Sequence, residues 1–311
     1  MSETVIEVHG LTKHYPGAKA VDGIDFDVHA GEVFSLLGPN GAGKTTTVEI
    51  LEGLRSPTGG TARVFGVDVS KDYGKIRRRV GVLPQEFEPF DRLTPTEAVT
   101  YWANLFDRRI SKADAKKLLG QVSLSERADV QGLKLSGGEK RKLGIAMALV
   151  GEPELLFLDE PTTGLDPKAR RDVWGLIRRI EGEGRTVILT THYLEEAEVL
   201  ADNVAIMHKG KIVAEGPPAE LVARSGARTT IVLGGAGKEG LEEVTRRGIP
   251  AVLDHDDVLV RVSDPREMKT ILAKLSALEA PLKDMYTRRA TLEDVFLRLV
   301  GAKMDEGVLQ A

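Results

Sequence analysis

The sequence contains no cysteine among its 311 residues. A disulfide, a zinc–thiolate centre and a thiol nucleophile are therefore all excluded, and the composition suits a reducing compartment. No stretch approaches the roughly 18 to 20 consecutive apolar residues that a membrane-spanning helix needs. The first ten residues also lack the basic stretch and apolar core of a secretory signal. If the protein acts at a membrane, a partner must supply the spanning helices.

The chain also lacks an excess of positive charge. Its 43 Lys and Arg residues stand against 47 Asp and Glu residues, which gives a formal net charge of −4. Proteins that bind nucleic acid usually carry a basic excess, so we expect no nucleic-acid partner. A hydrophobic fraction of 41% is ordinary for a folded globular protein. The length leaves room for one large domain and one smaller domain.

The amino-terminal part reads as the start of an α/β core. Segments Val5–Val8 and Ile24–Val28 have the pattern of strands, and Val33–Leu37 is a short apolar run typical of a buried strand. A glycine-rich stretch follows, and Thr45–Leu54 then has apolar residues on one helical face. Strand, glycine loop and helix in this order predict an α/β fold.

The middle of the chain has a different pattern. Residues 86–150 are mostly helical in periodicity, so we interpret this region as a helical subdomain inserted into the α/β core. Strand signals return afterwards, with a helix between the first two strands and a hairpin at the end. These later elements are predicted at Leu155–Leu158, Lys168–Glu181, Val187–Thr190, Val204–His208 and Lys211–Ala214.

After Pro217-Pro218 the composition changes again, and the order of elements becomes strand-helix-strand-strand-helix-strand. This order predicts a small α+β accessory domain with ferredoxin-like connectivity. A last helix is predicted over Thr291–Val300, with Thr291 as its N-cap. We therefore divide the chain into domains 1–221 and 222–311. The other predicted elements are Arg228–Leu233, Leu241–Arg247, Ala251–Leu253, Val258–Val262, Pro265–Leu278 and Leu282–Tyr286.

The glycine-rich stretch has the spacing of a phosphate-binding loop. Its residues are Gly38, Pro39, Asn40, Gly41, Ala42, Gly43, Lys44 and Thr45, which match G-x-x-x-x-G-K-[ST]. Glycines let backbone N–H groups surround phosphate oxygens, and the following helix directs its N-terminal dipole at the same anion. We expect Lys44 to reach the β- and γ-phosphates of a nucleotide, Thr45 to bind Mg²⁺ and Thr46 to contact the α-phosphate. A chance glycine turn is less favoured, because a strand precedes the loop and a helix follows it.

Two carboxylates, Asp159 and Glu160, follow the predicted buried strand Leu155–Leu158. Paired acids at the end of a buried strand are unusual without a partner. We expect Asp159 to hold the metal through its water shell and Glu160 to polarise an attacking water, as phosphoryl transfer requires. The alternative, a strand that simply ends in solvent-exposed acids, becomes less favoured once a phosphate loop precedes it.

A third motif, Leu135-Ser136-Gly137-Gly138-Glu139, opens a predicted helix over residues 138–150. The N-terminus of such a helix is a second anion site, although a serine N-cap followed by two glycines is also a common structural feature. With the two motifs above, it resembles the signature sequence of ABC ATP-binding cassettes, over roughly Val5–Leu221. The resemblance implies a P-loop NTPase fold with an α/β core, an antiparallel β region and the inserted helical subdomain. It also implies that MgATP is bound and hydrolysed between two copies, with Ser136 and Gly138 of one copy contacting the γ-phosphate held by the other.

Further residues match the family one by one. By resemblance, Tyr15 stacks on adenine, Gln85 contacts Mg²⁺ and the attacking water, and His192 contacts the γ-phosphate; Gly164-Leu165-Asp166 resembles the loop where two subunits meet. Each also has a structural alternative, such as a strand-end tyrosine in turn chemistry for Tyr15. The signature usually ends in glutamine, whereas this chain has Glu139. An acid there is unfavourable near a triphosphate unless it points away or caps the helix.

The carboxyl-terminal segment Thr291–Leu297 is similar to the accessory domain of ATPases that serve ABC-2-type exporters, particularly the drug-resistance (daunorubicin-type) subfamily; a generic capping helix is the alternative. The resemblance implies an ATP-hydrolysing subunit of an exporter of multidrug or lipid-like substrates. It implies a homodimer or a pair with another ABC subunit, an integral membrane permease of ABC-2 type as partner, and a peripheral position at the cytoplasmic face of the membrane.

Two other classes of function agree less well with the sequence. A soluble ABC ATPase acting on ribosomes or DNA usually carries two cassettes or a long coiled-coil insertion, and this chain shows neither pattern. A nucleotide-binding module without hydrolysis is less favoured, because the residues expected to act in hydrolysis are all present: Lys44, Asp159, Glu160 and His192.

The segment Glu86–Thr94 carries Phe87, Phe90 and Leu93 just beyond Gln85. Exposed aromatic side chains are typical interface anchors, so this segment is a candidate docking surface for a cytoplasmic helix of the permease. Equally, these side chains could fill the core of the helical subdomain.

Overall fold

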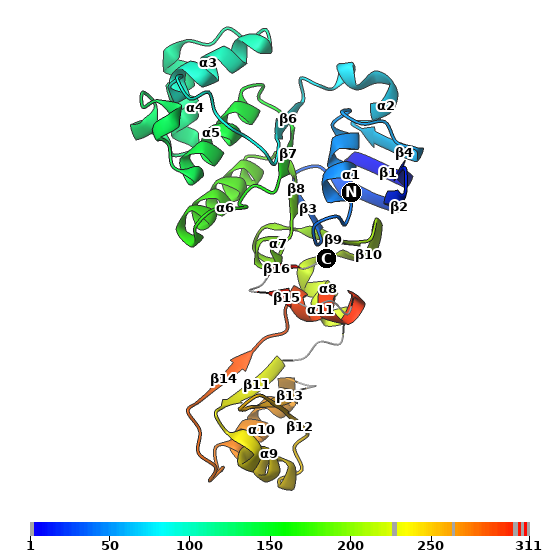
Figure 1. The fold of residues 1–311 in the computed structure, drawn as a ribbon, viewed down its shortest axis with the longest axis vertical. Coiled ribbons are helices and arrows are strands. Elements are labelled where there is room, and N and C mark those ends of the chain that lie inside the picture. Colours follow the sequence, from blue (N-terminus) through cyan, green and yellow to red (C-terminus); the bar gives the residue numbers. More distant parts are fainter. Residues whose placement is uncertain (1–2, 226–228, 263–264, 301–303, 306–307, 310–311) are drawn as a thin grey trace. The chain divides into compact units, whose positions relative to one another are not determined.

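The computed structural model describes residues 3–225, 229–262, 265–300, 304–305 and 308–309, which fall into two compact units (Figure 1). The first unit comprises Met1–Pro218 with Leu299–Ala311, and the second comprises Ala219–Arg298. The domain boundary predicted at residue 221 falls inside helix α8 (Pro218–Arg224). Among the described residues, no helix combines the length and the apolar character that crossing a membrane requires.

A six-stranded sheet lies at the centre of the first unit, in the order β10-β9-β3-β8-β7-β6. Five of its strands are parallel, and β10 pairs antiparallel with β9. Every residue of β3, β7 and β8 is buried, which explains why apolar residues stand at consecutive positions in these strands. The strands are β3 (Val33–Leu37), β6 (Val80–Leu83), β7 (Leu155–Asp159), β8 (Thr186–Thr191), β9 (Asn203–His208) and β10 (Lys211–Gly216).

An antiparallel sheet, in the order β2-β1-β4-β5, covers one face of this central sheet together with helix α1 (Figure 1). Phe26 of the outer sheet stacks on Phe34 of β3, with ring centroids 5.2 Å apart. Strand β1 runs well beyond the predicted Val5–Val8, because shifts in its pairing register interrupt the apolar–polar alternation. Strand β4 was not predicted, since its Gly59-Gly60 start resembles a turn. The bounds are β1 (Thr4–Tyr15), β2 (Ala18–His29), β4 (Gly59–Val64), β5 (Val67–Asp68), α1 (Lys44–Leu51) and α2 (Val69–Asp72).

Helices cover the opposite face of the central sheet. Helices α3, α4 and α5 begin with reciprocal capping boxes at Thr94, Ser111 and Ser136, which satisfy backbone N–H groups that a helix start would otherwise leave unpaired. Helix α1 ends earlier than predicted, because Gly53 adopts a positive φ of 68°. The helices are α3 (Pro95–Leu105), α4 (Lys112–Gln121), α5 (Gly137–Leu149), α6 (Pro167–Gly182) and α7 (Leu194–Leu200), with short 3₁₀ helices η1 (Tyr73–Lys75), η2 (Ser125–Arg127) and η3 (Gly132–Lys134).

The second unit contains an antiparallel sheet in the order β12-β13-β11-β14. Along the chain the elements follow as β11-α9-β12-β13-α10-β14. This chain order, combined with the sheet order, is the predicted ferredoxin-like connectivity. Helices α9 and α10 pack on one face, where Ile231, Leu233 and Val260 form part of the core. The elements are β11 (Thr229–Gly234), α9 (Gly237–Arg246), β12 (Ala251–Asp254), β13 (Asp257–Val262), η4 (Pro265–Glu267), α10 (Met268–Leu275), β14 (Asp284–Arg288) and α11 (Leu292–Val300); β15 (Met304–Asp305) and β16 (Val308–Leu309) follow.

Several predicted bounds in this part differ from the structure, and helix α9 begins four residues before the predicted Leu241. The predicted helix Pro265–Leu278 is divided into η4 and the shorter α10. Strand β14 begins two residues later than predicted, because Leu282 packs against the helix-covered core instead of entering the strand. Arg228, the predicted start of the first strand, lies outside the described residues.

Candidate active site

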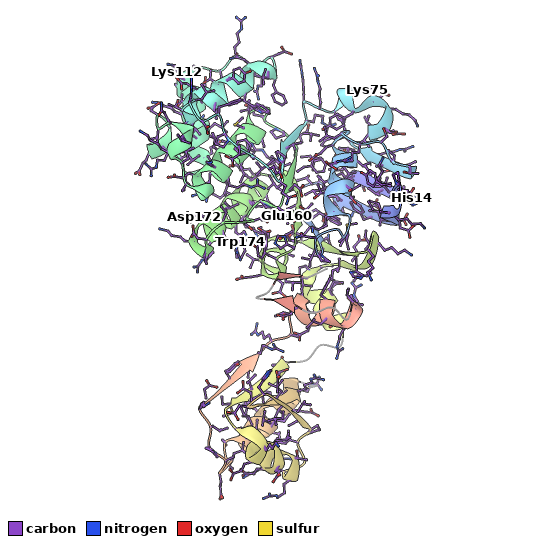
Figure 2. All side chains as sticks on the ribbon, in the orientation of Figure 1. His14, Lys75, Lys112, Glu160, Asp172 and Trp174 are labelled. Carbon is purple, nitrogen blue, oxygen red and sulfur yellow. The ribbon has the colours of Figure 1, made fainter. Side chains whose placement is uncertain are left out.

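The carboxyl ends of four parallel strands meet at one edge of the central sheet, and each is followed by a residue or loop singled out in the sequence. The glycine-rich loop follows β3, Gln85 lies just after β6, and His192 follows β8. Asp159 is the last residue of β7, and Glu160 comes directly after it. Ligand sites of open α/β sheets lie at this edge. Glu160, labelled in Figure 2, lies in the middle of the first unit.

The glycine-rich loop is held closely against neighbouring backbone. A Cβ atom at Gly38 would lie 2.3 Å from the Met207 carbonyl oxygen, and one at Gly43 would lie 2.2 Å from that of Ala20. Gly43 also has a φ of 105°, which side chains rarely adopt. The loop borders a hollow of about 350 Å³ in front of helix α1, lined by Ala20, Asn40, Gly41, Ala42, Gly43, Lys44, Thr45, Thr46, Gln85 and Glu160.

Lys44 is the buried cation of this hollow, with 4% of its surface exposed. Its ammonium donates hydrogen bonds to the carbonyl oxygens of Gly38 (2.7 Å) and Pro39 (3.1 Å). Its Nζ atom also lies 3.7 Å from Oε1 of Glu160. Burial lowers the pKa of Lys44, and the carboxylates of Glu160 and Asp159 oppose that shift. The loop therefore presents a positive charge and backbone N–H groups to one space, which suits a polyphosphate.

Asp159 and Thr45 bring hard oxygen atoms together beside the loop. The Thr45 hydroxyl donates to Oδ1 of Asp159 at 3.4 Å, and the hydroxyl of Thr190 donates to the same oxygen. Burial raises the pKa of Asp159, whereas the two hydroxyl donors act in the opposite direction. A hydroxyl and a carboxylate next to a phosphate loop are the donor set that Mg²⁺ takes when phosphates and water complete its shell. The residues present therefore fit a magnesium ion.

Glu160 has more partners than any other predicted site residue. Its Oε2 accepts hydrogen bonds from Gln85 Nε2 (3.3 Å) and Thr163 Oγ1 (3.0 Å), and its Oε1 lies 3.1 Å from Nδ1 of His192. Burial alone would raise the pKa of Glu160, but the His192 ring and the Lys44 ammonium outweigh it and lower the pKa. The carboxylate is thus kept ionised and oriented at the hollow. The backbone of Glu160 has a φ of 45°, which is uncommon for a residue other than glycine and marks a strained position.

Thr190 was not singled out in the sequence, yet it connects the two acids. Besides its bond to Asp159, its Oγ1 accepts a hydrogen bond from the Glu160 backbone N–H at 3.0 Å. Thr163 was also missed. Thr190 ends the predicted strand Val187–Thr190, and Thr163 precedes Gly164-Leu165-Asp166. Only the three-dimensional packing shows which carboxylate each threonine contacts.

Arg141 is the largest omission of the sequence analysis. This side chain on α5 is 9% exposed, and its guanidinium donates to carbonyl oxygens of two loops. The acceptors are those of Pro84 (2.9 Å), Gln85 (3.2 Å), Asp159, Glu160 (2.8 Å) and Pro161 (2.9 Å). Burial lowers the pKa of Arg141 to about 10, so it stays charged at neutral pH. An arginine within a basic run, Lys140-Arg141-Lys142, carries no sequence signal that distinguishes it from a solvated charge.

The signature segment forms the start of α5. The Ser136 side chain accepts a hydrogen bond from the Glu139 backbone at 3.3 Å, while the Glu139 carboxylate accepts one from the Ser136 backbone at 2.8 Å. Arg127 donates to the other oxygen of Glu139 at 2.7 Å. Glu139 therefore caps its own helix and is paired with a cation, which accounts for an acid at this position. A Cβ at Gly138 would lie 2.9 Å from Cβ of Ala169, so glycine permits the close approach of α5 and α6.

Six of the predicted nucleotide contacts are not among the residues that line the hollow. Gly38, Pro39 and His192 adjoin it through Lys44 and Glu160, whereas Tyr15, Ser136 and Gly138 belong to other parts of the chain. Tyr15 ends β1 and is 36% exposed, with the Lys13 ammonium 5.2 Å from its ring centroid. Ser136 and Gly138 begin α5 in the helical subdomain.

In the candidate docking segment Glu86–Thr94, some of the apolar side chains fill the core and one is exposed. Phe87 and Leu93 are partly buried and pack against the core of the helical subdomain. Phe90 is 45% exposed and makes an edge contact with Tyr101, whose ring centroid is 5.6 Å away. Phe90 is therefore the exposed aromatic side chain of this segment, and it is paired with Tyr101 of α3.

Comparison with known proteins shows the family of the chain. The model of the ABC transporter family matches residues 21–163. The chain is 39% identical to the daunorubicin/doxorubicin resistance ATP-binding protein DrrA of Streptomyces peucetius, over 97% of this chain and 94% of that protein. It is also 39% identical to the Nod factor export ATP-binding protein I of Mesorhizobium japonicum, over 98% of this chain and 89% of that protein.

Solved structures give the same fold. A dimeric ATP-binding cassette, described as a post-hydrolysis state bound to ADP and Pi, is 26% identical and has a TM-score of 0.62; the match covers 68% of this chain and 98% of that chain. An ATP-binding cassette of an ABC transporter in its ADP conformation is 22% identical, with a TM-score of 0.63 over 70% of this chain and 93% of that chain.

Fold and site together define a P-loop ATPase of the ATP-binding cassette class, so the predicted fold class is confirmed. The chain belongs to the family of ABC transporter ATP-binding proteins, and its relatives include ATP-binding proteins named for drug resistance and for Nod factor export. Its function is that of an ATP-binding and ATP-hydrolysing exporter subunit, and the alternative of a soluble ATPase acting on ribosomes or DNA is not favoured.

Proposed function

We propose that two copies of this chain bind and hydrolyse MgATP between them, at the cytoplasmic face of the membrane, and drive a separate ABC-2-type permease that exports a drug-like or lipid-like substrate. The arrangement of Glu160 carries this proposal, because its ionised carboxylate lies 3.7 Å from Lys44 and is oriented by Gln85, Thr163 and His192. The names of the two relatives above, a daunorubicin/doxorubicin resistance protein and a Nod factor export protein, support an export function.

In this mechanism the glycine-rich loop and Lys44 hold the β- and γ-phosphates, with Thr46 at the α-phosphate and Tyr15 against adenine. Thr45, Asp159 and Gln85 would hold Mg²⁺, which supplies charge neutralisation on the phosphates when bound. Glu160 accepts a proton from, and orients, the water that attacks the γ-phosphorus. His192 fixes Oε1 of Glu160 and contacts the γ-phosphate. Hydrolysis depends on positioning and charge, and all of these groups project from one sheet edge.

The second copy supplies what one copy lacks. Because Ser136 and Gly138 do not line the hollow of their own chain, they are available for the γ-phosphate of a partner copy. The start of α5 is suited to that anion, since Ser136 and Glu139 satisfy each other's backbone N–H groups and leave the remaining N–H groups of the first turn free to donate.

Hydrolysis is tested by steady-state turnover of the purified chain with MgATP, with Glu154→Gln as the matched control, since Glu154 is an exposed carboxylate paired with Arg79. The proposal requires turnover in the wild type and the control, and its near loss in Glu160→Gln. Turnover that persists in Glu160→Gln would contradict the role given to this carboxylate.

The proposed association with a permease is tested by copurification of the chain from membranes of the source cell. The proposal requires an integral membrane protein in stoichiometric amount, whereas ribosomes or DNA without a membrane protein would contradict it. Charge reversal at Glu88 and Asp91, beside the Phe90–Tyr101 pair, should weaken this assembly and leave nucleotide affinity unchanged. Glu88 pairs with Lys140, so Asp91→Lys is the cleaner of the two variants.

A further inference from the structure

One buried acid of the first unit has no part in the mechanism above. Glu196 lies in the first turn of α7, and its exposed fraction is 0%. Burial raises the pKa of its carboxyl, whereas nearby hydrogen-bond donors and the charge of Arg170 act in the opposite direction. A glutamate is rarely buried completely without partners, so the hydrogen bonds of Glu196 indicate what it does.

Two donors meet at one oxygen atom of Glu196. Its Oε1 accepts a hydrogen bond from the Thr162 hydroxyl at 2.7 Å and another from Nε1 of Trp174 at 2.9 Å. Trp174, labelled in Figure 2, belongs to α6, whereas Thr162 belongs to the loop between β7 and α6. A single acceptor therefore joins a helix and a loop to the start of α7.

Thr162 lies in a tight turn that begins at Glu160. The backbone N–H of Thr163 donates to the Glu160 carbonyl oxygen at 3.3 Å, and the Thr163 hydroxyl donates to Oε2 of Glu160 at 3.0 Å. We call residues Glu160–Thr163 the Glu160 turn. Its first residue has the positive φ described above, and surrounding contacts have to maintain such a strained backbone. The Thr162 side chain supplies one of these contacts, because it anchors the turn to α7.

The acceptor end of this hydrogen bond is close to His192 in the chain. Helix α7, which carries Glu196, begins two residues after His192. Nδ1 of His192 lies 3.1 Å from Oε1 of Glu160, so the two segments are already joined by this contact. The hydrogen bond between Thr162 and Glu196 adds a second connection between the same segments. Two connections restrict their relative position more than one connection does.

We propose that Glu196 is a positioning residue for hydrolysis: through its hydrogen bond to Thr162 it holds the Glu160 turn, so that the Glu160 carboxylate stays directed at the attacking water. This inference rests on the role given to Glu160 in the proposed function. Glu196 does not line the nucleotide hollow, so it acts on the rate of turnover without contacting the nucleotide.

The two donors to Glu196 provide the test, because each can be removed singly from the same oxygen atom. Thr162→Val removes the donor in the Glu160 turn, and Trp174→Phe removes the donor on α6. We expect Thr162→Val to lower kcat for MgATP about tenfold, with KM changed about twofold or less, because the turn loses an anchor while the nucleotide contacts stay. Trp174→Phe is the matched control. It should lower the stability of the fold and keep kcat within about twofold of the wild type.

Variants of Glu196 itself separate positioning from packing. Glu196→Gln keeps an oxygen acceptor for Thr162 and should keep kcat within about threefold of the wild type, whereas Glu196→Met fills similar space without that acceptor and should lose kcat about tenfold. Combining Glu196→Met with Thr162→Val should cost no more kcat than either change alone, since both remove the same hydrogen bond. Glu195→Gln, exposed on the same helix, should have no effect. Retained affinity for MgATP shows that each variant is folded.

Three results would overturn the inference: an unchanged kcat in Thr162→Val, equal losses of kcat in Thr162→Val and Trp174→Phe, or a Glu196→Gln chain as slow as Glu196→Met. Glu160→Gln is assayed beside these variants. Turnover that persists in Glu160→Gln contradicts the proposed function, and this inference with it. Turnover that is lost in Glu160→Gln but unchanged in Thr162→Val overturns this inference alone.

Discussion

The guanidinium of Arg141 donates a hydrogen bond to the main-chain carbonyl oxygen of Glu160, at 2.8 Å. The same guanidinium binds the Gln85 carbonyl oxygen at 3.2 Å, and Arg141 lies on the helix that Ser136 begins. One side chain thus joins the segment proposed to contact a partner's nucleotide with both residues proposed to position the attacking water. A movement of α5 would therefore act directly on the backbone at Gln85 and Glu160.

Replacing Arg141 should damage turnover more than nucleotide binding. Arg141→Met leaves several buried carbonyl groups without a donor, and we expect a loss of folding free energy on the order of 3 kcal/mol and at least a tenfold fall in kcat, with KM for ATP changed about twofold or less. Arg141→Lys, with one donor atom in place of three, should recover only part of kcat. Arg171→Met on the exposed side of α6 is the control. An unchanged kcat in Arg141→Met would show that the guanidinium positions nothing of consequence.

Arg127 and Glu139 should be energetically coupled. Removing Arg127 leaves the Glu139 carboxylate unpaired beside the anion site of α5, so Arg127→Ala should weaken ATP-driven dimerisation about threefold, an effect of the size expected for a half-exposed pair. Glu139→Gln alone should have little effect, and it should abolish the effect of Arg127→Ala in the double variant. Dimer formation measured against ATP concentration at low and at high salt checks this, because salt should shrink the Arg127→Ala effect. Equal effects of Arg127→Ala in the wild-type and in the Glu139→Gln background would rule the coupling out.

Glu52 should make the first unit less stable as the pH rises. Burial, with the charges of Asp159 and Glu49, raises the pKa of Glu52 from 4.5 to about 8. The folded chain therefore keeps a proton that the unfolded chain releases between these values, and the free energy of unfolding falls as the pH rises through that window. Glu52→Gln should remove this dependence and be more stable than the wild type at about pH 8.5, by on the order of 3 kcal/mol, with little difference at about pH 4.5.

Denaturant unfolding followed by tryptophan fluorescence measures this effect in the first unit, which holds both tryptophans, Trp102 and Trp174. Glu49→Gln is a useful second variant, because it removes only a minor cause of the raised pKa. A Glu52→Gln chain whose stability follows the same pH profile as the wild type would mean that Glu52 is ionised in the folded protein.

The sequence was sufficient for the parts of the site that are local in the chain. Lys44, Thr45, Asp159 and Glu160 stand in short motifs directly after apolar strands, and parallel strands place such motifs at one edge. Arg141, Thr163 and Thr190 could not be found in this way. Arg141 binds loops 18 to 57 residues away, and Thr190 binds acids 30 and 31 residues before it, so their roles exist only in the folded chain.

In the fold, too, elements with a clear apolar pattern were predicted from the sequence, and elements without one were not. Buried strands with continuous apolar character, such as β3 and β7, were found with nearly correct bounds. Strand β4 begins with two glycines and was missed, and β14 is exposed along its whole length, so its bounds carried no alternating pattern. Helix α7 was missed because only two residues separate it from β8 and its seven residues resemble a loop rich in acids.

The central claim is that hydrolysis takes place between two copies, at a site that Glu160 activates. The most direct measurement is the sedimentation of the Glu160→Gln chain at low micromolar concentration. With MgATP it should sediment as a stable dimer that hydrolyses ATP at least about a hundredfold more slowly than the wild type, and with MgADP as a monomer. A Glu160→Gln chain that binds ATP and remains a monomer, or that turns over at the wild-type rate, would contradict the account.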